Sequence, residues 1–180
     1  MSNPSALGAV LAHKAQAFSD FTGRAISWLT FIMMLLMTTV VLLRYGFNMG
    51  WIAMQESILY LHAFVLMLGI AYTLSKNEHV RVDIFYRRFS PSKQKWVNIL
   101  GHLVFLIPTC VFVMILSWQY VAQSWQILEG SQEAGGVPLV YLLKSLLIIT
   151  PLLLIIEALA QIVLLLAGKT AFAEKEEEVL

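Results

Sequence analysis

Charge is scarce in this chain. Only 13% of its 180 residues are Asp, Glu, Lys or Arg, against about a quarter in soluble domains, while 59% are hydrophobic. The mean hydropathy is +0.76. These values exclude an ordinary soluble domain and predict an integral membrane protein. The net charge of +1 adds little, because membrane proteins use charge by location rather than by sum.

Cysteine and catalytic motifs are scarce as well. Cys110 is the single cysteine and lies in an apolar run, so no internal disulfide can form. The sequence has no P-loop, no HExxH zinc site and no nucleophile elbow, and its few polar residues do not assemble a triad. We therefore expect no enzyme, no bound cofactor and no metal site.

Long apolar runs dominate what is present. The first begins near Ala25, is too long for a signal-peptide core and lacks a small-residue cleavage site after it, so we expect it to remain as a membrane span. At about 1.5 Å per residue, four such runs can cross a hydrocarbon core of about 30 Å as helices. The predicted spans are 25–43, 52–74, 92–128 and 138–167. The predicted fold is an all-α integral membrane protein with four transmembrane helices in two antiparallel hairpins, within a membrane domain of residues 25–168.

Three segments lie outside these spans. Residues 1–24 form a modestly amphipathic arm that we expect to lie as a helix in the cytoplasmic interface, with a frayed tail as the alternative. The central belt, 76–95, mixes six basic residues with apolar ones, which predicts a second interfacial amphipathic segment rather than a mobile solvated loop. Residues 169–180 are predicted to be a solvated acidic tail.

The basic residues predict the orientation. Ten of the 12 Lys and Arg residues lie in the arm, the belt and the tail, whereas the opposite side has only Arg44 and Lys144. The positive-inside rule therefore places both termini and the belt in the cytoplasm. Because topology accounts for the basic belt, we do not expect nucleic acid as a partner.

Glu157 is the most conspicuous polar residue, because it lies more than two turns from either end of the last span. An ionised carboxylate is costly there and is usually paired, protonated or functional. One interpretation is a proton or ion site, and the other is a structural carboxylate that hydrogen-bonds a neighbouring helix or contacts a partner subunit. Depth along the helices puts His102 a turn or so away, so we predict a small buried polar cluster of His102, Glu157 and Gln161.

On the predicted periplasmic side, Arg44 ends the first span and Glu56 begins the second. A hairpin brings them to similar depth, where an ion pair and two separately solvated side chains are equally compatible with the sequence. Lys144 is expected to snorkel to the headgroups. The connector before the fourth span carries a polar, mildly acidic rim that we expect to contact a partner protein. Its members are Gln126, Glu129, Gln132 and Glu133.

Two histidines raise a different class, a membrane anchor for a redox complex in which two imidazoles bind one haem. His62 lies in the periplasmic half of the second span and His102 in the cytoplasmic half of the third. They are therefore roughly 10 Å or more apart along the membrane normal, and one iron cannot bind both. The two remaining histidines lie in cytoplasmic segments and do not change this, so a haem is not expected.

A series of short elements resembles a known family. The elements are Arg44-Tyr45 at the end of the first span, Glu56 at the start of the second, Gly69-Ile70-Ala71-Tyr72 near its end, Glu78-His79-Val80-Arg81-Val82-Asp83 after it, Tyr120 and Ser124 on the third span, and Pro138 after a Gly-rich loop. In their order and spacing, over about residues 24–167, they resemble the small, DctQ-like membrane subunit of tripartite ATP-independent periplasmic (TRAP) transporters.

The resemblance implies a non-catalytic subunit of a sodium-coupled solute importer in the bacterial inner membrane. A periplasmic substrate-binding protein captures an organic acid, a large membrane subunit carries the substrate and sodium sites, and the small subunit braces the large one and helps to dock the binding protein. Lipid is the remaining partner. The structural or partner-contact candidates are Arg44, Glu56, Glu78, His79, Arg81, Asp83, His102, Glu129, Glu133 and Glu157. The alternatives are a redox-complex anchor and a small proton-coupled transporter that uses Glu157.

Overall fold

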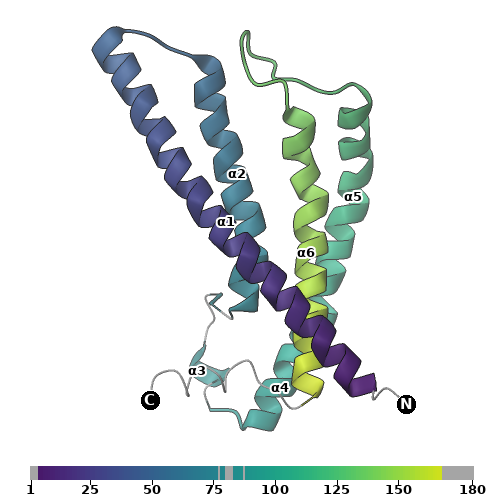
Figure 1. Cartoon of the computed structure of the whole chain (residues 1–180). Helices are drawn as coiled ribbons and strands as arrows, with labels where there is room; N and C mark the ends of the chain where they lie inside the picture. Colours follow the sequence, from purple (N-terminus) through teal and green to yellow (C-terminus); the bar gives the residue numbers. More distant parts are fainter. Residues whose placement is uncertain (1–3, 77, 80–82, 87, 168–180) are drawn as a thin grey trace.

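The part of the chain that the structure describes consists of helices and connecting loops, without a strand (Figure 1). The structure is a computed structural model and describes residues 4–76, 78–79, 83–86 and 88–167. The elements are α1 (Pro4–Phe47), α2 (Ile52–Ser75), α3 (Asp83–Tyr86), α4 (Pro91–Leu100), the π-helical turn η1 (Gly101–Leu106), α5 (Ile107–Gln126) and α6 (Val140–Leu166). The predicted all-α class is confirmed.

Four helices in the described ranges are long and apolar enough to cross a membrane, in agreement with the four predicted spans. They are Ala17–Phe47, Ile52–Ser75, Pro91–Gln126 and Val140–Leu166. The third comprises α4, η1 and α5 as one continuous helix. The predicted ends agree to within two residues, except for the first span, whose helix begins well before residue 25 and ends at Phe47, four residues after the predicted end at residue 43.

α1 continues without a break through the predicted boundary at residue 24. Its 44 residues correspond to about 66 Å at 1.5 Å per residue, roughly twice the thickness of a hydrocarbon core. Beyond Pro4 no proline interrupts it. It ends at Phe47, where Asn48 adopts a left-handed φ of 52° and the N–H of Met49 donates to the C=O of Leu43 at 3.0 Å. The arm and the first span are therefore one rod, which crosses α6 obliquely in Figure 1.

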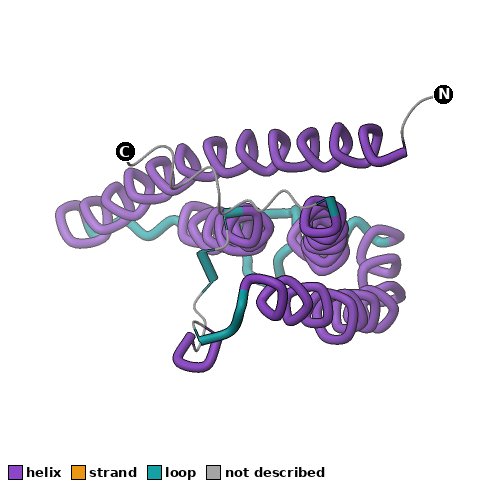
Figure 2. Tube along the Cα trace, turned by 90° about the horizontal axis from the view of Figure 1, so that it is seen from below, coloured by secondary structure: helices purple, strands orange, loops and turns teal. Residues whose placement is uncertain are grey.

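α6 is the central helix of the bundle. It packs against α1, α2 and α5, and α1 also packs against α2. α6 carries more buried residues than any other helix, and Leu146, Glu157 and Ala158 are among those almost fully enclosed. By contrast, α1 and α5 leave many large apolar side chains exposed, which suits contact with lipid or with another membrane protein. Figure 2 shows α1 running across one side of the other helices.

The π-helical turn η1 has its cause in Pro108. Proline has no N–H, and in a regular α-helix its ring would clash with the C=O of Val104. The turn absorbs this conflict by widening, so that the N–H of Ile107 donates to the C=O of His102, five residues back. The third long helix thus stays continuous, and His102 lies in its irregular turn.

Gly23 allows α1 to approach α2 closely. A Cβ at Gly23 would lie 2.5 Å from the ring of Tyr72, so that a methyl group forces the aromatic ring to move. We expect Gly23→Ala to destabilise the protein by about 1–3 kcal/mol, the usual range for overpacking. The measurement is the Tm of the purified protein in detergent.

Gly46→Ala is the matched control on the same helix. A Cβ there meets nothing within 4 Å, and alanine is the better helix former, so its Tm should be unchanged or slightly higher. Equal Tm values for the two variants would contradict the close approach of α1 to α2.

Candidate functional site

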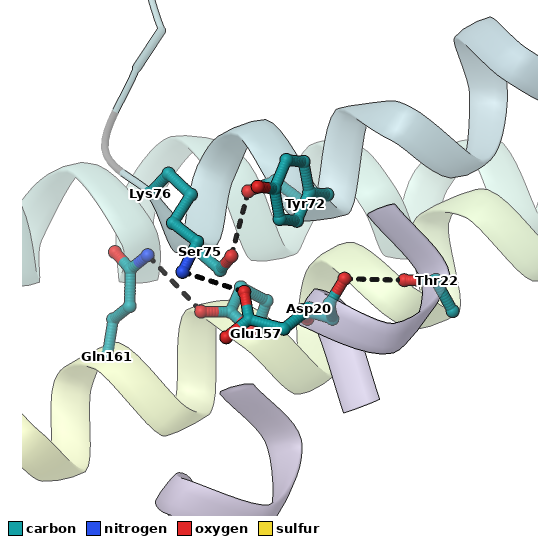
Figure 3. Close-up of polar contacts among 8 residues, drawn as sticks. Asp20, Thr22, Tyr72, Ser75, Lys76, Glu157 and Gln161 are labelled. Atoms are coloured by element: carbon teal, nitrogen blue, oxygen red, sulfur yellow. Dashed lines mark hydrogen bonds and ion pairs between the residues drawn. The ribbon is translucent and has the colours of Figure 1, made fainter. Parts of the chain in front are cut away.

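Glu157 lies at the centre of a polar cluster that joins α1 to α6. Its side chain is only 1% exposed. The hydroxyl of Ser19 on α1 donates to Glu157 Oε2 at 3.1 Å, and Gln161 Nε2, one turn further along α6, donates to Oε1 at 3.4 Å. Figure 3 shows Glu157 and Gln161 beside the end of α2 that carries Ser75 and Lys76. Both carboxylate oxygens therefore have partners within the chain.

Gln161 connects this carboxylate to two further helices. Its Nε2 also donates to the C=O of Leu74 at 2.6 Å, one of the last carbonyls of α2, which lack ordinary helical partners. Its Oε1 lies 3.1 Å from His102 Nε2. Because Oε1 is an acceptor, His102 must carry its proton on Nε2 in this arrangement. One amide side chain thus joins α2, η1 and α6.

The structure brings His102, Glu157 and Gln161 together, with Gln161 as the bridge between the other two. Ser19 was missed, because residues 1–24 were assigned to the membrane interface. A signal was present in the sequence. Ser19, Gly23 and Ser27 recur every four residues, the spacing of small side chains at which helices pack closely.

An ion pair lies next to this cluster at the end of α2. Lys76 Nζ is 2.7 Å from Asp20 Oδ1 on α1 and 5.8 Å from the centroid of the Tyr72 ring. The hydrogen bond to Asp20 raises the pKa of Lys76 above its ordinary value. Both side chains are more than a third exposed, so the pair contributes little to stability. Its position nevertheless attaches α1 to the end of α2 (Figure 3).

Glu56 holds the loop between α5 and α6 at the opposite end of the bundle. Its carboxylate accepts hydrogen bonds from the hydroxyl of Ser131 and, at 2.6 Å, from the N–H of Val137. A Cβ at Gly136 would lie 2.6 Å from Glu56 Oε2, which explains the glycine there. The Arg44–Glu56 ion pair does not form within the described residues, and the Arg44 side chain is exposed. For Arg44, the observed arrangement is therefore the second alternative, an exposed side chain that is not paired with Glu56.

Glu129 forms an ion pair with Lys144 instead of joining an exposed rim. Lys144 Nζ is 2.5 Å from Glu129 Oε2 and 3.9 Å from the centroid of the Tyr120 ring, and the two charged side chains are 15% and 26% exposed. The hydrogen bond from Lys144 holds the pKa of Glu129 below its ordinary value. This carboxylate and this ring engage the ammonium group of Lys144, in addition to the predicted position near the headgroups.

Three other candidates, Glu78, His79 and Glu133, have exposed side chains. His79 is exposed, and Glu78 is exposed while its backbone N–H donates to the C=O of Thr73 at 3.1 Å. Glu133 is exposed, and its N–H donates to Ser131 Oγ at 3.1 Å. Two further candidates, Arg81 and Asp83, follow Glu78 and His79 in the belt.

Arg81 lies outside the described residues, and Asp83 is described only as the first residue of α3. Over the described ranges, no group of three or more His, Cys, Asp or Glu side chains could hold a metal ion.

The fold and the placement of polar groups define a class of protein, a multi-pass α-helical membrane protein that satisfies its deepest carboxylate internally. Residues 33–168 match the family described as tripartite ATP-independent periplasmic transporters, DctQ component. This region is most of the chain, so the chain belongs to the DctQ component family of TRAP transporters. The resemblance drawn from the sequence is confirmed.

One relative is a Haemophilus influenzae protein assigned as a TRAP transporter small permease protein. It is 27% identical over 107 residues, which cover 57% of this chain and 66% of that protein. The chain thus matches just under two thirds of the relative's length. No solved structure matches the chain.

Gln161→Leu tests the bridge between the helices. The change removes the partners of the Leu74 C=O and of His102 Nε2, and leaves Glu157 with Ser19 alone. We expect a loss of about 1–3 kcal/mol, the cost of leaving buried polar groups unpaired. The measurement is unfolding of the purified protein in detergent.

The control is Gln123→Leu, at an exposed position on α5. It should leave the unfolding free energy nearly unchanged. An equal effect of the two changes would show that the amide at position 161 does not bridge helices.

Glu129→Gln tests the ion pair with Lys144 through its pH dependence. The pKa of Glu129 is lowered in the folded state, so the ionised carboxylate stabilises the folded protein. This contribution is complete above the ordinary carboxyl pKa of about 4.3, and it is lost as the pH falls through the lowered pKa. The wild type should therefore have the higher Tm at pH 7, and the difference should shrink on acidification. Glu133→Gln is the exposed control, and a difference that is constant with pH would contradict the pairing.

Proposed function

We propose that this chain is the non-catalytic small permease subunit of a sodium-coupled TRAP importer of organic acids. It braces the large membrane subunit and helps to dock the periplasmic substrate-binding protein. Family membership supports the subunit assignment. Sodium coupling and an organic acid as the solute are proposed from the sequence resemblance alone. The chain resides in the bacterial inner membrane with both termini and the belt in the cytoplasm, because ten of its 12 basic residues lie on that side.

The enclosure of Glu157 is the observation that carries the non-catalytic role. A carrier of solutes places polar groups near the midplane, where they face a path for the solute. Here the deepest carboxylate is 1% exposed and is bonded by Ser19 and Gln161 of the same chain. These groups hold helices together, which is what a brace requires.

A pocket on the α5–α6 pair has the wrong chemistry for an organic acid. Its volume is about 290 Å³, and apolar side chains such as Trp118, Val121 and Ile148 form most of its lining. Its polar lining group, Ser145, already accepts from Trp125 Nε1 at 2.8 Å and donates to a backbone carbonyl. No cationic side chain lines it, so the pocket suits lipid better than a carboxylate.

The arrangement of the helices supports bracing. Consecutive long helices lie side by side, α1 with α2 and α5 with α6, which supports the proposed two antiparallel hairpins. The Glu157 cluster joins the hairpins at one end, and Glu56 joins them at the other through the loop after α5. The arm extends this brace as the first part of the α1 rod, and we propose that the belt extends it as an amphipathic segment in the cytoplasmic interface.

The loop between α5 and α6 is the proposed docking surface for the binding protein. Glu56 holds its backbone at Val137, so the loop presents a defined surface. Gln132 and Glu133 are exposed on it, whereas Glu129 is engaged by Lys144. The docking surface is therefore smaller than the rim expected from the sequence.

Glu157→Gln distinguishes a brace from a proton-coupled carrier. The substitution keeps the shape of the side chain and one acceptor oxygen, replaces the other oxygen with an amide donor whose hydrogen bond the Ser19 hydroxyl can accept, and removes the ionisation. In vesicles with the complete three-part transporter, sodium-driven uptake should stay close to the wild-type rate, and this chain alone should transport nothing. Loss of uptake from an intact, co-purifying complex would assign a chemical role to Glu157 and contradict the proposal.

A further inference from the structure

His62 differs in its surroundings from Glu157 and His102, two other ionisable side chains deep in the described spans. It lies ten residues after Ile52, about 15 Å along α2 and hence near the middle of a hydrocarbon core of about 30 Å. Glu157 and His102 are 1% and 8% exposed and are hydrogen-bonded within the chain. The His62 side chain is exposed, and the hydrogen bonds and ion pairs among the described residues do not include it.

Three neighbours place His62 on a defined surface. Leu59, His62 and Leu66 follow helical spacing on one face of α2, and the two leucines are 65% and 55% exposed. Gly69 continues the same face, and a Cβ there meets nothing within 4 Å. We name these four residues the α2 stripe. It presents two bulky apolar groups, one imidazole and an open space at the glycine.

Lipid is a poor cover for the α2 stripe. An imidazole that faces hydrocarbon gives up its hydrogen bonds to water and gains none, so ionisable groups at this depth are normally covered by protein. Open space at a glycine lets a second helix backbone approach closely. The chemistry of the stripe is therefore complementary to a helix that carries one polar group, whereas the apolar faces of α1 and α5 need only lipid.

We propose that the α2 stripe is the surface on which a transmembrane helix of the large membrane subunit packs, with a hydroxyl, carboxamide or carboxylate group hydrogen-bonded to His62. This inference rests on the proposed function and names the contact face of the brace. A second copy of this chain is a weaker occupant. A two-fold contact through the same stripe would place two imidazoles opposite each other instead of a complementary group.

Photocrosslinking in the complete complex tests the assignment. Benzoylphenylalanine is introduced at Leu59 or at Leu66, with Phe112 on α5, which is 61% exposed, as the comparison position. Wild-type chain that fails to co-purify with the large subunit overturns both this inference and the proposed function. With co-purification intact, adducts with the large subunit from both α2 positions support the inference. Adducts only with lipid or with a second copy overturn the inference alone, whatever Phe112 shows.

Substitution of His62 tests the polar contact itself. In the intact complex, His62→Leu should weaken association with the large subunit about threefold to twentyfold, the range expected for one interhelical hydrogen bond. His62→Gln, which can still donate and accept, should restore most of the affinity. The Tm of the isolated chain should not fall for either variant, because the imidazole is exposed there. Unchanged association of the His62→Leu variant would overturn the hydrogen bond to the partner.

Discussion

The hydrocarbon core of a membrane offers no hydrogen bonds, and the rest of this structure depends on how the chain meets that constraint. Polar groups inside the core must find partners in protein. Gln161 is the partner of three such groups, because its amide reaches Glu157, the last turn of α2 and His102 at once. That one side chain links α2 and the third long helix to α6, in addition to the packing of these helices on α6, and Ser19 adds a link to α1.

The two described ion pairs serve a different purpose from this buried network. Asp20–Lys76 lies at one end of the bundle, and Glu129–Lys144 lies at the other. Partly exposed pairs add little stability, since water competes for both charges. Each pair nevertheless joins two segments at a particular depth. Together they oppose rotation or sliding of α1 and of the α5–α6 loop. The largely apolar outer surfaces of the bundle do not specify such positions by themselves.

Hydropathy predicted the four membrane-spanning helices because the thickness of the hydrocarbon core sets their length. The start of the first span was misplaced, since the arm and the span are chemically different but form one helix without a proline to break it. The His102–Gln161–Glu157 cluster followed from depth alone. The partners of Glu56 and Lys144 were not predicted, because their contacts depend on the path of the α5–α6 loop, and nothing in hydropathy or charge specifies that path.

α2 is clamped at both ends. Glu56 in its first turns holds the loop at Val137, and the C=O of Leu74 in its last turn accepts from Gln161. The two clamps are 18 residues apart, or about 27 Å along the axis. Both hydrogen bonds are 2.6 Å long, so axial sliding has to change the geometry of both ends at once. A sideways load at the middle of the helix would instead be shared between the two ends. α2 is therefore held at both ends, so that it bends more readily at its middle than it moves along its own axis.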